Sequence, residues 1–445
     1  MELNRLYQEH IDTLTARYTR IINDLTSQGL ALEGLLIHAG SDNYYFADDQ
    51  HVAFHSVPHF AHWVPLEGPD HLLCFQPGIK PHLFRYVPQD FWYETPIDKA
   101  DHWQSAFEMV TLDSPEKAAS HLPNLSHFAY IGNSPALAQS FGIAPENIEP
   151  KRLMTRLDYQ RSIKTPYEVA CLQLANGRAA RGHQAAKAAF EAGLSEREIQ
   201  RDYLSAIEAV ETDTPYGNII ALDEKAAILH YQQKRGRQAA PGKLLLIDAG
   251  AKSFGYGSDI TRTYLRNNDE PLFTELLHRM ERLQRSLVEQ VRVGISYVDI
   301  HRATHQGVAK ILADTGLIKL SAHEILARGF THPFFPHGVG HLLGIQVHDV
   351  AGKVADEDGT PLPPPPEYPF LRLTRNIEAG QVFTIEPGFY FIPMLLAPHR
   401  SAEYSHYFDW ALIDRLTPLG GIRIEDNIHV TTAGAENLTR AVLSN

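Results

Sequence analysis

The chain has 445 residues and a formal net charge of -13. One hydrophobic core rarely grows to this length, so we expect two domains. The hydrophobic fraction of 44% is ordinary for a globular protein and argues against large-scale disorder. The negative charge argues against a protein that binds nucleic acid through its phosphates. Two cysteines, Cys74 and Cys171, are too few for a disulfide framework, which favours a reducing compartment.

The N-terminus is predicted to form an amphipathic helix. Apolar residues from Leu3 to Leu25 recur at helical spacing among acidic and basic residues. This stretch lacks the continuous apolar core of a signal peptide, and no later segment offers about 18 uninterrupted apolar residues that could span a membrane. The sequence therefore predicts a cytoplasmic protein without a membrane partner.

Residues 1–157 are predicted to form a smaller N-terminal α/β domain, because helix-like and strand-like runs alternate along them. Short buried strands are expected at 35–38, 72–75 and 128–131. The aromatic, His-rich stretch 44–63 is unusual for a plain scaffold. We expect this stretch to cover a site.

Residues 158–445 are predicted to form a second domain of the α+β class. Thr165, Pro166 and Glu168 have the pattern of a helix start with a capping box, a candidate for the opening of this domain. Antiparallel-looking strands dominate from about residue 216 onward, and this mixed order favours α+β over a doubly wound sheet. Helical patterns are predicted at 165–193, 195–211, 270–292 and 297–315.

A proline-rich loop at 361–369 is predicted to be an extended, stiff surface segment. A ligand for an SH3-like domain is the less favoured alternative for this loop. The sequence assigns it no role in the chemistry.

The first chemical signal is a pair of aspartates at the ends of two strand-like runs. Asp248 ends an apolar run, glycines turn the chain, and Asp259 begins a β-branched run. The segment is therefore predicted to be a hairpin with the two carboxylates on neighbouring strands. A carboxylate at the end of an apolar strand is costly unless it is paired or coordinated. Turn residues that face water are the alternative at this point.

The second signal is a group of three histidines, His337, His341 and His348, in a glycine-rich segment. The first two have the spacing of one helical turn, but the glycines between them argue against a regular helix. Glycine there instead permits close approach of the backbone. A single histidine is more often a core or surface residue, whereas the group favours a role in metal binding or proton transfer.

Two glutamates complete the pattern. Glu386 lies at the end of an apolar run just before a Pro-Gly turn, where a solvated surface residue is not expected in a central strand. Further along, strand alternation places Arg423 and Glu425 on one face and their isoleucine neighbours on the other. An Arg–Glu ion pair on a solvated strand face is the alternative for this second segment.

Together the segments supply four carboxylates and one imidazole, an oxygen-rich set that suits Mn, Co or Mg better than a structural zinc site. Two divalent ions would balance four negative charges, whereas one ion would leave the buried acids under-neutralised and raise their pKa values. Two ions roughly 3.5–4 Å apart would lower the pKa of a bridging water and polarise a carbonyl. The residues therefore predict a dinuclear hydrolytic centre.

These segments, in this order, resemble the pita-bread (creatinase/aminopeptidase-like) metallopeptidases, which include methionine aminopeptidase, aminopeptidase P and prolidase. The resemblance implies a C-terminal pita-bread catalytic domain that holds two divalent ions, with Mn²⁺ expected first and Co²⁺ or Mg²⁺ as alternatives. In the family pattern Asp259 and Glu425 bridge the two ions. Asp248 then holds one ion, and His341 with Glu386 holds the other.

Further segments resemble the bacterial Xaa-Pro dipeptidases (PepQ-type prolidases), the group to which the organophosphorus acid anhydrolases belong. The resemblance implies that a metal-bridging hydroxide hydrolyses dipeptides with a C-terminal proline, that organophosphorus triesters or fluoridates are secondary substrates, and that the chain forms a homodimer. The segments that carry it are 214–218, 227–231, 334–338 and 420–427.

The implied mechanism assigns roles to particular residues. Glu386 is the best candidate to manage the proton of the attacking water. His348 or His230 would donate a hydrogen bond to the developing oxyanion. His337 and Arg423 would contact the carboxylate end of the substrate, and Arg423 would also offset the residual negative charge of the centre.

Two tyrosines and one acid complete the expected substrate site. Tyr216 and Tyr297 would line the pocket. By resemblance, an acid of the N-terminal domain of the partner subunit approaches the substrate amine, and Asp49 is the matching position, with Asp48 as the alternative.

Two other functions remain open on the sequence. Aminopeptidase P, which trims longer peptides with proline in second place, shares the covering N-terminal domain, whereas methionine aminopeptidase usually lacks it. Some pita-bread relatives are binding modules that have lost their metals, and the complete ligand set argues against that class.

Overall fold

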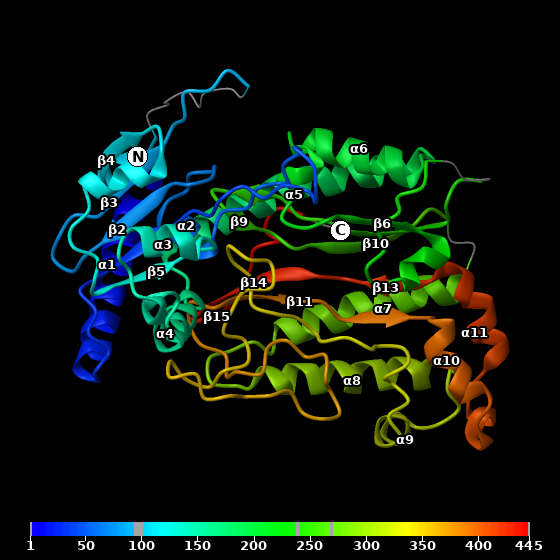
Figure 1. Ribbon diagram of the computed structural model, residues 1–445. Helices are drawn as coiled ribbons and strands as arrows, with labels where there is room; N and C mark the ends of the chain where they lie inside the picture. The colour runs from blue at the N-terminus through cyan, green and yellow to red at the C-terminus, as the bar shows by residue number, and fades with distance from the viewer. Residues whose placement is uncertain (1, 93–100, 237–239, 268–269, 444–445) are drawn as a thin grey trace. The chain divides into compact units, whose positions relative to one another are not determined.

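The computed structural model of the protein describes residues 2–92, 101–236, 240–267 and 270–443 (Figure 1). It divides into two compact units. Unit 1 comprises Met1–Arg161, Thr165–Ala170 and Asp356–Thr360, and unit 2 comprises Ser162–Lys164, Cys171–Ala355 and Pro361–Asn445. Within the described ranges, no helix combines the length and the apolar character that crossing a bilayer requires.

Unit 1 is built around a mixed five-stranded sheet. Its strands are β1 (Gly34–His38), β2 (Leu72–Phe75), β3 (His82–Tyr86), β4 (Glu108–Leu112) and β5 (Phe128–Ile131). The strand order is β4-β3-β2-β1-β5, with β1 antiparallel to β2 and parallel to β5. The strands predicted at 35–38, 72–75 and 128–131 are therefore confirmed.

The helices of unit 1 are α1 (Glu2–Ser27), α2 (Pro58–Trp63), α3 (Pro135–Ser140) and α4 (Lys151–Arg161). The predicted N-terminal amphipathic helix is confirmed as α1, whose apolar side chains Leu14, Ile21 and Leu25 are fully buried. Tyr18 of α1, Trp63 of α2 and Phe75 of β2 pack ring against ring, with centroids 5.0–5.8 Å apart. Aromatic packing therefore joins the two helices to this strand.

Unit 2 contains small antiparallel sheets joined by bridges. Its strands are β6 (Ile219–Leu222), β7 (Leu244–Asp248), β8 (Lys252–Ser253), β9 (Tyr256–Gly257), β10 (Thr261–Leu265), β11 (Val382–Ile385), β12 (Gly388–Tyr390), β13 (Gly421–Arg423), β14 (Asp426–Thr431) and β15 (Gly434–Asn437). The sheets are β10-β7-β6, β11-β14-β15, β12-β13 and β8-β9. A bridge between Thr261 and Glu425 links the first sheet to the C-terminal strands.

The helices of unit 2 are α6 (Glu196–Ala206), α7 (Pro271–Val288), α8 (Tyr297–Asp314), α9 (Ala322–Ala327), α10 (Pro393–Arg400) and α11 (Trp410–Leu416), together with α5 (Pro166–Glu191), whose first turn belongs to unit 1. The predicted capping box at the start of α5 is confirmed, since the Thr165 N–H donates to Glu168 Oε2 at 2.8 Å and the Glu168 N–H to Thr165 Oγ1 at 3.4 Å. The start of α5 does not open unit 2, because residues 165–170 belong to unit 1 and unit 2 takes up the helix only from Cys171.

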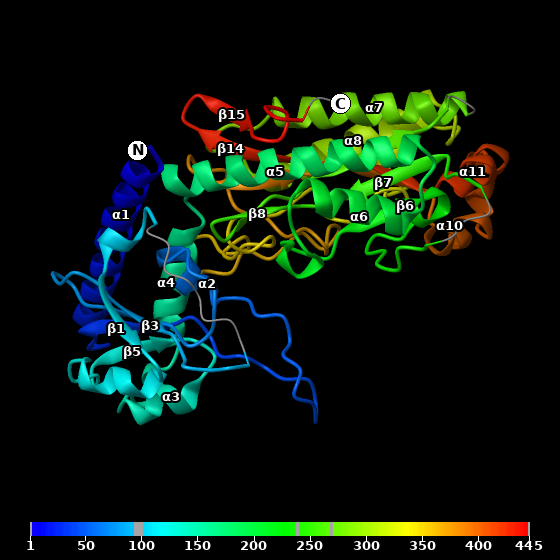
Figure 2. The same ribbon diagram turned by 90° about the horizontal axis from the view of Figure 1, so that it is seen from above.

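The two faces of the β6–β7–β10 sheet pack against different helices. Leu245 and Ile247 belong to a cluster with apolar residues of α5 and α6, whereas Leu244 and Leu246 belong to the cluster that includes α7 and α8. In Figures 1 and 2, α5 and α6 lie on one side of the strands of this unit and α7 and α8 on the other. Because side chains alternate along a strand, Asp248 falls on the same face as Leu244 and Leu246.

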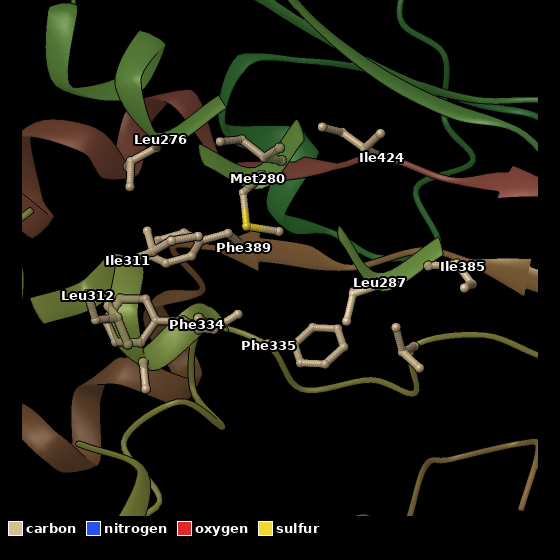
Figure 3. Packing of buried hydrophobic residues seen from close by; sticks show 14 of the residues in the cluster. Leu276, Met280, Leu287, Ile311, Leu312, Phe334, Phe335, Ile385, Phe389 and Ile424 are labelled. Atoms are coloured by element: carbon tan, nitrogen blue, oxygen red, sulfur yellow. The ribbon is translucent and has the colours of Figure 1, made fainter. Parts of the chain in front are cut away.

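The larger apolar cluster supports this inner face. Figure 3 shows Met280 and Leu287 of α7 and Leu312 of α8 among aromatic side chains that include Phe335 and Phe389. All five are at most 1% exposed. Antiparallel sheets with helices on their outer faces confirm the α+β prediction for this part of the chain.

Both cysteines, Cys74 in β2 and Cys171 in α5, are buried thiols. Burial raises the pKa of Cys74 to about 12.

Candidate metal centre

Asp248 and Asp259 are brought together by the antiparallel pair β7 and β10. Asp248 ends β7 and lies opposite Thr261, two residues after Asp259. The Tyr216 hydroxyl lies 2.8 Å from Asp248 Oδ1 and 2.6 Å from Asp259 Oδ1. Both carboxylates therefore face one phenol. The predicted antiparallel strand pair is confirmed as β7 and β10, but Asp259 lies just before β10 and not within it.

His341 approaches the same carboxylates from a loop. Its Nδ1–H donates to the Leu342 carbonyl at 3.0 Å, which leaves Nε2 facing Asp259 Oδ2 at 3.3 Å and Glu386 Oε1 at 3.6 Å. The segment from 335 to 349 contains no helix, as the glycines predicted. A Cβ at Gly340 would overlap the Thr384 carbonyl oxygen, so glycine is what lets this loop lie against β11.

The two glutamates come from the C-terminal strands. Glu386 follows β11, and Glu425 lies between β13 and β14, where it accepts a hydrogen bond from Thr261 Oγ1 at 2.6 Å. Asp259, His341 and Glu425 are 6%, 3% and 2% exposed, and each offers a donor atom within 4.8 Å of the other two. The four segments singled out from the sequence thus converge on one buried place in unit 2.

Arg423 lies inside this cluster. Its Nη2 donates to Asp248 Oδ2 at 2.6 Å and its Nε to Thr261 Oγ1 at 3.2 Å, and the residue is 4% exposed. Ile422 and Ile424 point the other way, into the large apolar cluster. The predicted alternation is confirmed, and the alternative of a solvated Arg–Glu surface pair is excluded.

The carboxylates influence one another strongly. Burial raises the pKa of Glu386 to about 7 and raises that of Glu425 well above its usual range, and repulsion from the aspartates adds to both shifts. Burial also raises the pKa of Asp248 against the attraction of Arg423. Burial opposes ionisation of Asp259 too, but hydrogen bonds from His341 and Tyr216 outweigh it and lower the pKa.

The donor set fits divalent cations. Once ionised, the four carboxylates contribute four negative charges, and Arg423 with a protonated His341 would return only two of them. A buried excess of negative charge at oxygen donors is what hard divalent ions neutralise. The oxygen-rich set with one imidazole nitrogen is typical of Mn, Co or Mg and not of a structural zinc site.

His337 and His348 lie beside the cluster in different ways. His337 Nε2 is 2.8 Å from the Tyr390 hydroxyl, which itself accepts from Arg423 Nη1 at 3.0 Å and so donates its own proton to His337. Burial lowers the pKa of His337 to about 3, with Arg423 adding to the shift, so the ring is neutral. His348 packs edge-on against His341, with centroids 4.3 Å apart, and keeps part of its surface in solvent. Partial removal of its ring from water, with the charge of His341, lowers its pKa to about 4.

The remaining predicted site residues differ in their surroundings. His230 is exposed, and its charge contributes to lowering the pKa values of His337 and His348. Tyr297 is fully buried, and its hydroxyl donates to the Thr384 carbonyl at 2.6 Å. Asp49 belongs to unit 1, where it is exposed in a loop.

Three residues of the centre were not anticipated from sequence. Thr261 links Glu425 to Arg423, Thr384 Oγ1 accepts the His341 N–H at 3.2 Å, and Tyr390 joins Arg423 to His337. A threonine in a β-branched run is expected as an ordinary strand former, so it gave no signal of its own. The sequence contained one indication of Tyr390. It follows Glu386 by an even number of positions in a strand-like segment, and even spacing places two side chains on the same face of a strand.

A second group of titratable side chains lies in unit 1. His10, His62 and Glu168 are buried, and each offers a donor atom within 4.8 Å of the other two. His10 already uses both ring nitrogens, towards Thr165 Oγ1 and the His62 carbonyl, each at 2.8 Å. Arg17 interacts electrostatically with Glu168 and supplies positive charge. We interpret the group as an internal polar network and not as a metal site.

Comparison with known proteins supports the grouping of these segments. The family described as "Metallopeptidase family M24" matches residues 170–432, and that described as "Xaa-Pro dipeptidase, N-terminal domain" matches residues 5–159. The chain is 44% identical over 443 residues to an Xaa-Pro dipeptidase of Pseudoalteromonas atlantica, and the match covers 99% of this chain and 98% of the relative. It is 42% identical over 444 residues to an Xaa-Pro dipeptidase of Proteus mirabilis, with the same coverage.

The fold also resembles solved structures. A variant of Escherichia coli aminopeptidase P matches with a TM-score of 0.71 and 22% identity, covering 97% of this chain and 96% of that one. Pseudomonas aeruginosa aminopeptidase PepP matches with the same values. With the family matches, this likeness confirms the predicted order of a smaller N-terminal domain followed by a pita-bread domain.

Proposed function

The chain belongs to metallopeptidase family M24, and on that premise we propose that it is a dinuclear-metal Xaa-Pro dipeptidase. The observation that carries the proposal is the buried convergence of Asp248, Asp259, His341, Glu386 and Glu425 in unit 2. Identity above 40% to Xaa-Pro dipeptidases along nearly the whole chain supports the substrate class. The proposed domain boundary remains 157/158.

We propose that these five residues hold two divalent ions, with Mn²⁺ expected first. Bound there, the metals would supply an activated water at neutral pH and an electrophile for the scissile carbonyl. Glu386 is proposed to manage the proton of the attacking water, because its carboxylate faces the place where the metals and that water would bind.

We propose that the substrate is held by residues around this centre. Arg423 uses three of its N–H groups on Asp248, Tyr390 and Thr261, and the two that remain are proposed to reach the proline carboxylate together with His337. His348 and His230 are proposed to donate to the developing oxyanion. Tyr216 and Tyr297 are proposed to shape the pocket.

The chain is further proposed to form a homodimer in which Asp49 approaches the substrate amine of the partner subunit. The loop around Asp49 exposes three consecutive aromatic residues, Tyr44, Tyr45 and Phe46, with 56%, 55% and 101% exposure. An exposed aromatic tip of this kind is typical of a surface that another chain covers. Sedimentation of the wild type and of Phe46→Ser tests the dimer. The buried thiols are consistent with the proposed cytoplasmic location.

The substrate proposal is tested by comparing Ala-Pro, Ala-Pro-Ala and Ala-Ala with and without Mn²⁺. Metal-dependent hydrolysis of Ala-Pro alone is the expected result. Cleavage of Ala-Pro-Ala would favour the aminopeptidase P alternative, and no hydrolysis of any of the three would exclude both. Purified protein that neither holds nor responds to a divalent metal would favour the binding-module alternative.

A secondary hydrolysis of organophosphorus triesters or fluoridates is also proposed. An activated water that attacks a peptide carbonyl is chemically able to attack phosphorus, provided that the pocket admits the ester. Release of p-nitrophenol from paraoxon, or of fluoride from a phosphofluoridate, by the Mn-loaded protein tests this. Cleavage of Ala-Pro with neither product would remove the secondary activity and leave the primary one intact.

A further inference from the structure

A buried ion pair lies at the base of the loop that carries His341 and His348. Lys164 Nζ donates to Asp349 Oδ2 at 2.7 Å, and the two side chains are 0% and 1% exposed. Removing two opposite charges from water costs several kcal/mol per ion, so a buried pair is weak evidence of a stabilising role. Its presence here therefore calls for a role other than stability.

The pair closes the loop at its far end. The Asp349 N–H donates to the Leu342 carbonyl at 2.9 Å, so the chain leaves after His341 and returns just after His348. Asp349 Oδ1 also accepts the Val350 N–H at 3.0 Å. With Asp349 held in this way, the preceding residue, His348, lies edge-on against the His341 ring.

Lys164 is itself held from the other side. Its backbone N–H donates to the Gly380 carbonyl at 2.8 Å, close before β11, the strand that leads to Glu386. Gly344, inside the loop, lies against the pair, because a Cβ there would clash with both Asp349 Oδ2 and Lys164 Nζ. Lys164 thus fixes the loop relative to the same strand that supplies a second metal-facing carboxylate.

We propose that Lys164 and Asp349 are positioning residues for the metal centre, setting the loop so that His341 meets the carboxylates and His348 faces the substrate space. The proposal rests on the proposed metal-dependent function of this site. Neither Lys164 nor Asp349 is adjacent in sequence to a proposed metal ligand. In the contacts described above, neither touches a ligand atom. They act through the loop, as outer partners that orient a ligating histidine.

Two readouts besides activity test the proposal. Titration with Mn²⁺ by calorimetry reports the affinity of the centre, and amide hydrogen exchange reports the order of residues 342–350. Lys164→Met is expected to weaken Mn²⁺ binding by roughly tenfold or more and to speed exchange in this segment, in line with the usual cost of losing an outer partner of a metal ligand. Gly344→Ala, which forces the pair apart without removing a charge, is expected to have the same two effects.

The double variant Lys164→Met/Asp349→Leu separates positioning from stability. An apolar pair of similar volume removes the cost of a lone buried charge, so its melting temperature is expected to return to the wild-type value. Mn²⁺ binding is expected to stay weak and exchange at 342–350 fast, because the apolar pair has no directional contact to hold the loop. Wild-type affinity and exchange in this variant would overturn the proposal.

Leu312→Ala provides the matched control, since it removes a fully buried side chain of α8 without touching the loop. It is expected to lower the melting temperature while leaving Mn²⁺ affinity and exchange at 342–350 unchanged. Equal loss of affinity in this control would show that general destabilisation is the cause and would also overturn the proposal. If the wild type binds Mn²⁺ but does not cleave Ala-Pro, the proposed function fails while both readouts still decide the role of the pair.

Discussion

Binding of a divalent metal at the centre is expected to release protons, because the carboxyl group of Glu386 is partly protonated at neutral pH. Burial raises the pKa of Glu386 to about 7, and repulsion from Asp259 and Asp248 contributes to the shift. The pKa of Glu425 is likewise raised well above its usual range. Metal ligands must be deprotonated, so a proton held before binding leaves when the metal arrives.

The size of the effect follows from the pKa of Glu386. A group with a pKa of about 7 is about 90% protonated at pH 6, about half at pH 7 and about 10% at pH 8. Glu386 alone is therefore expected to release about half a proton per site at pH 7. The sign is fixed as well: proton release falls, and apparent metal affinity rises, as the pH increases from 6 to 8.

Calorimetric titration of the metal-free protein with Mn²⁺, in buffers of different ionisation enthalpy at pH 6, 7 and 8, measures the protons released. Glu386→Gln is the matched variant, since its amide cannot titrate, and it is expected to reduce the release at pH 7 by about half a proton. A release of zero, or one that stays the same across the three pH values, would refute the reasoning. Zero release would mean that the carboxylates are already ionised before the metal binds, and a constant release would mean that Glu386 does not titrate between pH 6 and 8.

Three further outcomes are expected. Asp259→Asn should abolish hydrolysis of Ala-Pro with little change in melting temperature, because a neutral amide lacks the negative charge that bound divalent ions would need there; retained turnover would remove Asp259 from the centre. Gly340→Ala should lower kcat/KM at least roughly tenfold, since its methyl group displaces the loop from the Thr384 carbonyl, and unchanged kinetics would contradict this close approach. Burial lowers the pKa of His62 to about 4, so its share of stability, about 3 kcal/mol, is complete above about pH 6.5 and is lost as the pH falls towards 4. Urea unfolding between pH 4 and 7 measures that slope, which His62→Leu should reduce; an equal slope in both proteins would show that His62 does not cause it.

The parts of the site that sequence predicted are those that local periodicity determines. Alternation along a strand put Arg423 and Glu425 on one face, and an apolar run that ends in an acid put Asp248 at a strand end. These arguments need only the period of a strand and the cost of a buried charge. They predicted the ligand segments without any knowledge of which strands pair.

The parts that sequence did not predict depend on long-range register. The bridge between Thr261 and Glu425 joins strands more than 160 positions apart, and it is this pairing that places a hydroxyl between the carboxylate and Arg423. Lys164 is equally remote from Asp349, 185 positions along the chain. No local pattern identifies such partners, because lysine before a helix usually faces solvent.

The burial of both thiols has a practical consequence for spectroscopy. Thiolates and not thiols react with maleimide or nitroxide reagents, and a pKa of about 12 leaves Cys74 almost entirely protonated at neutral pH. Cys171 is fully buried in α5, out of reach of such reagents. The two native cysteines are therefore expected to react very little with such reagents. A single cysteine introduced in place of the exposed Phe46 would then take up almost all of the spin label or fluorophore. The signal of that label would report how far the aromatic tip of the loop is exposed to solvent.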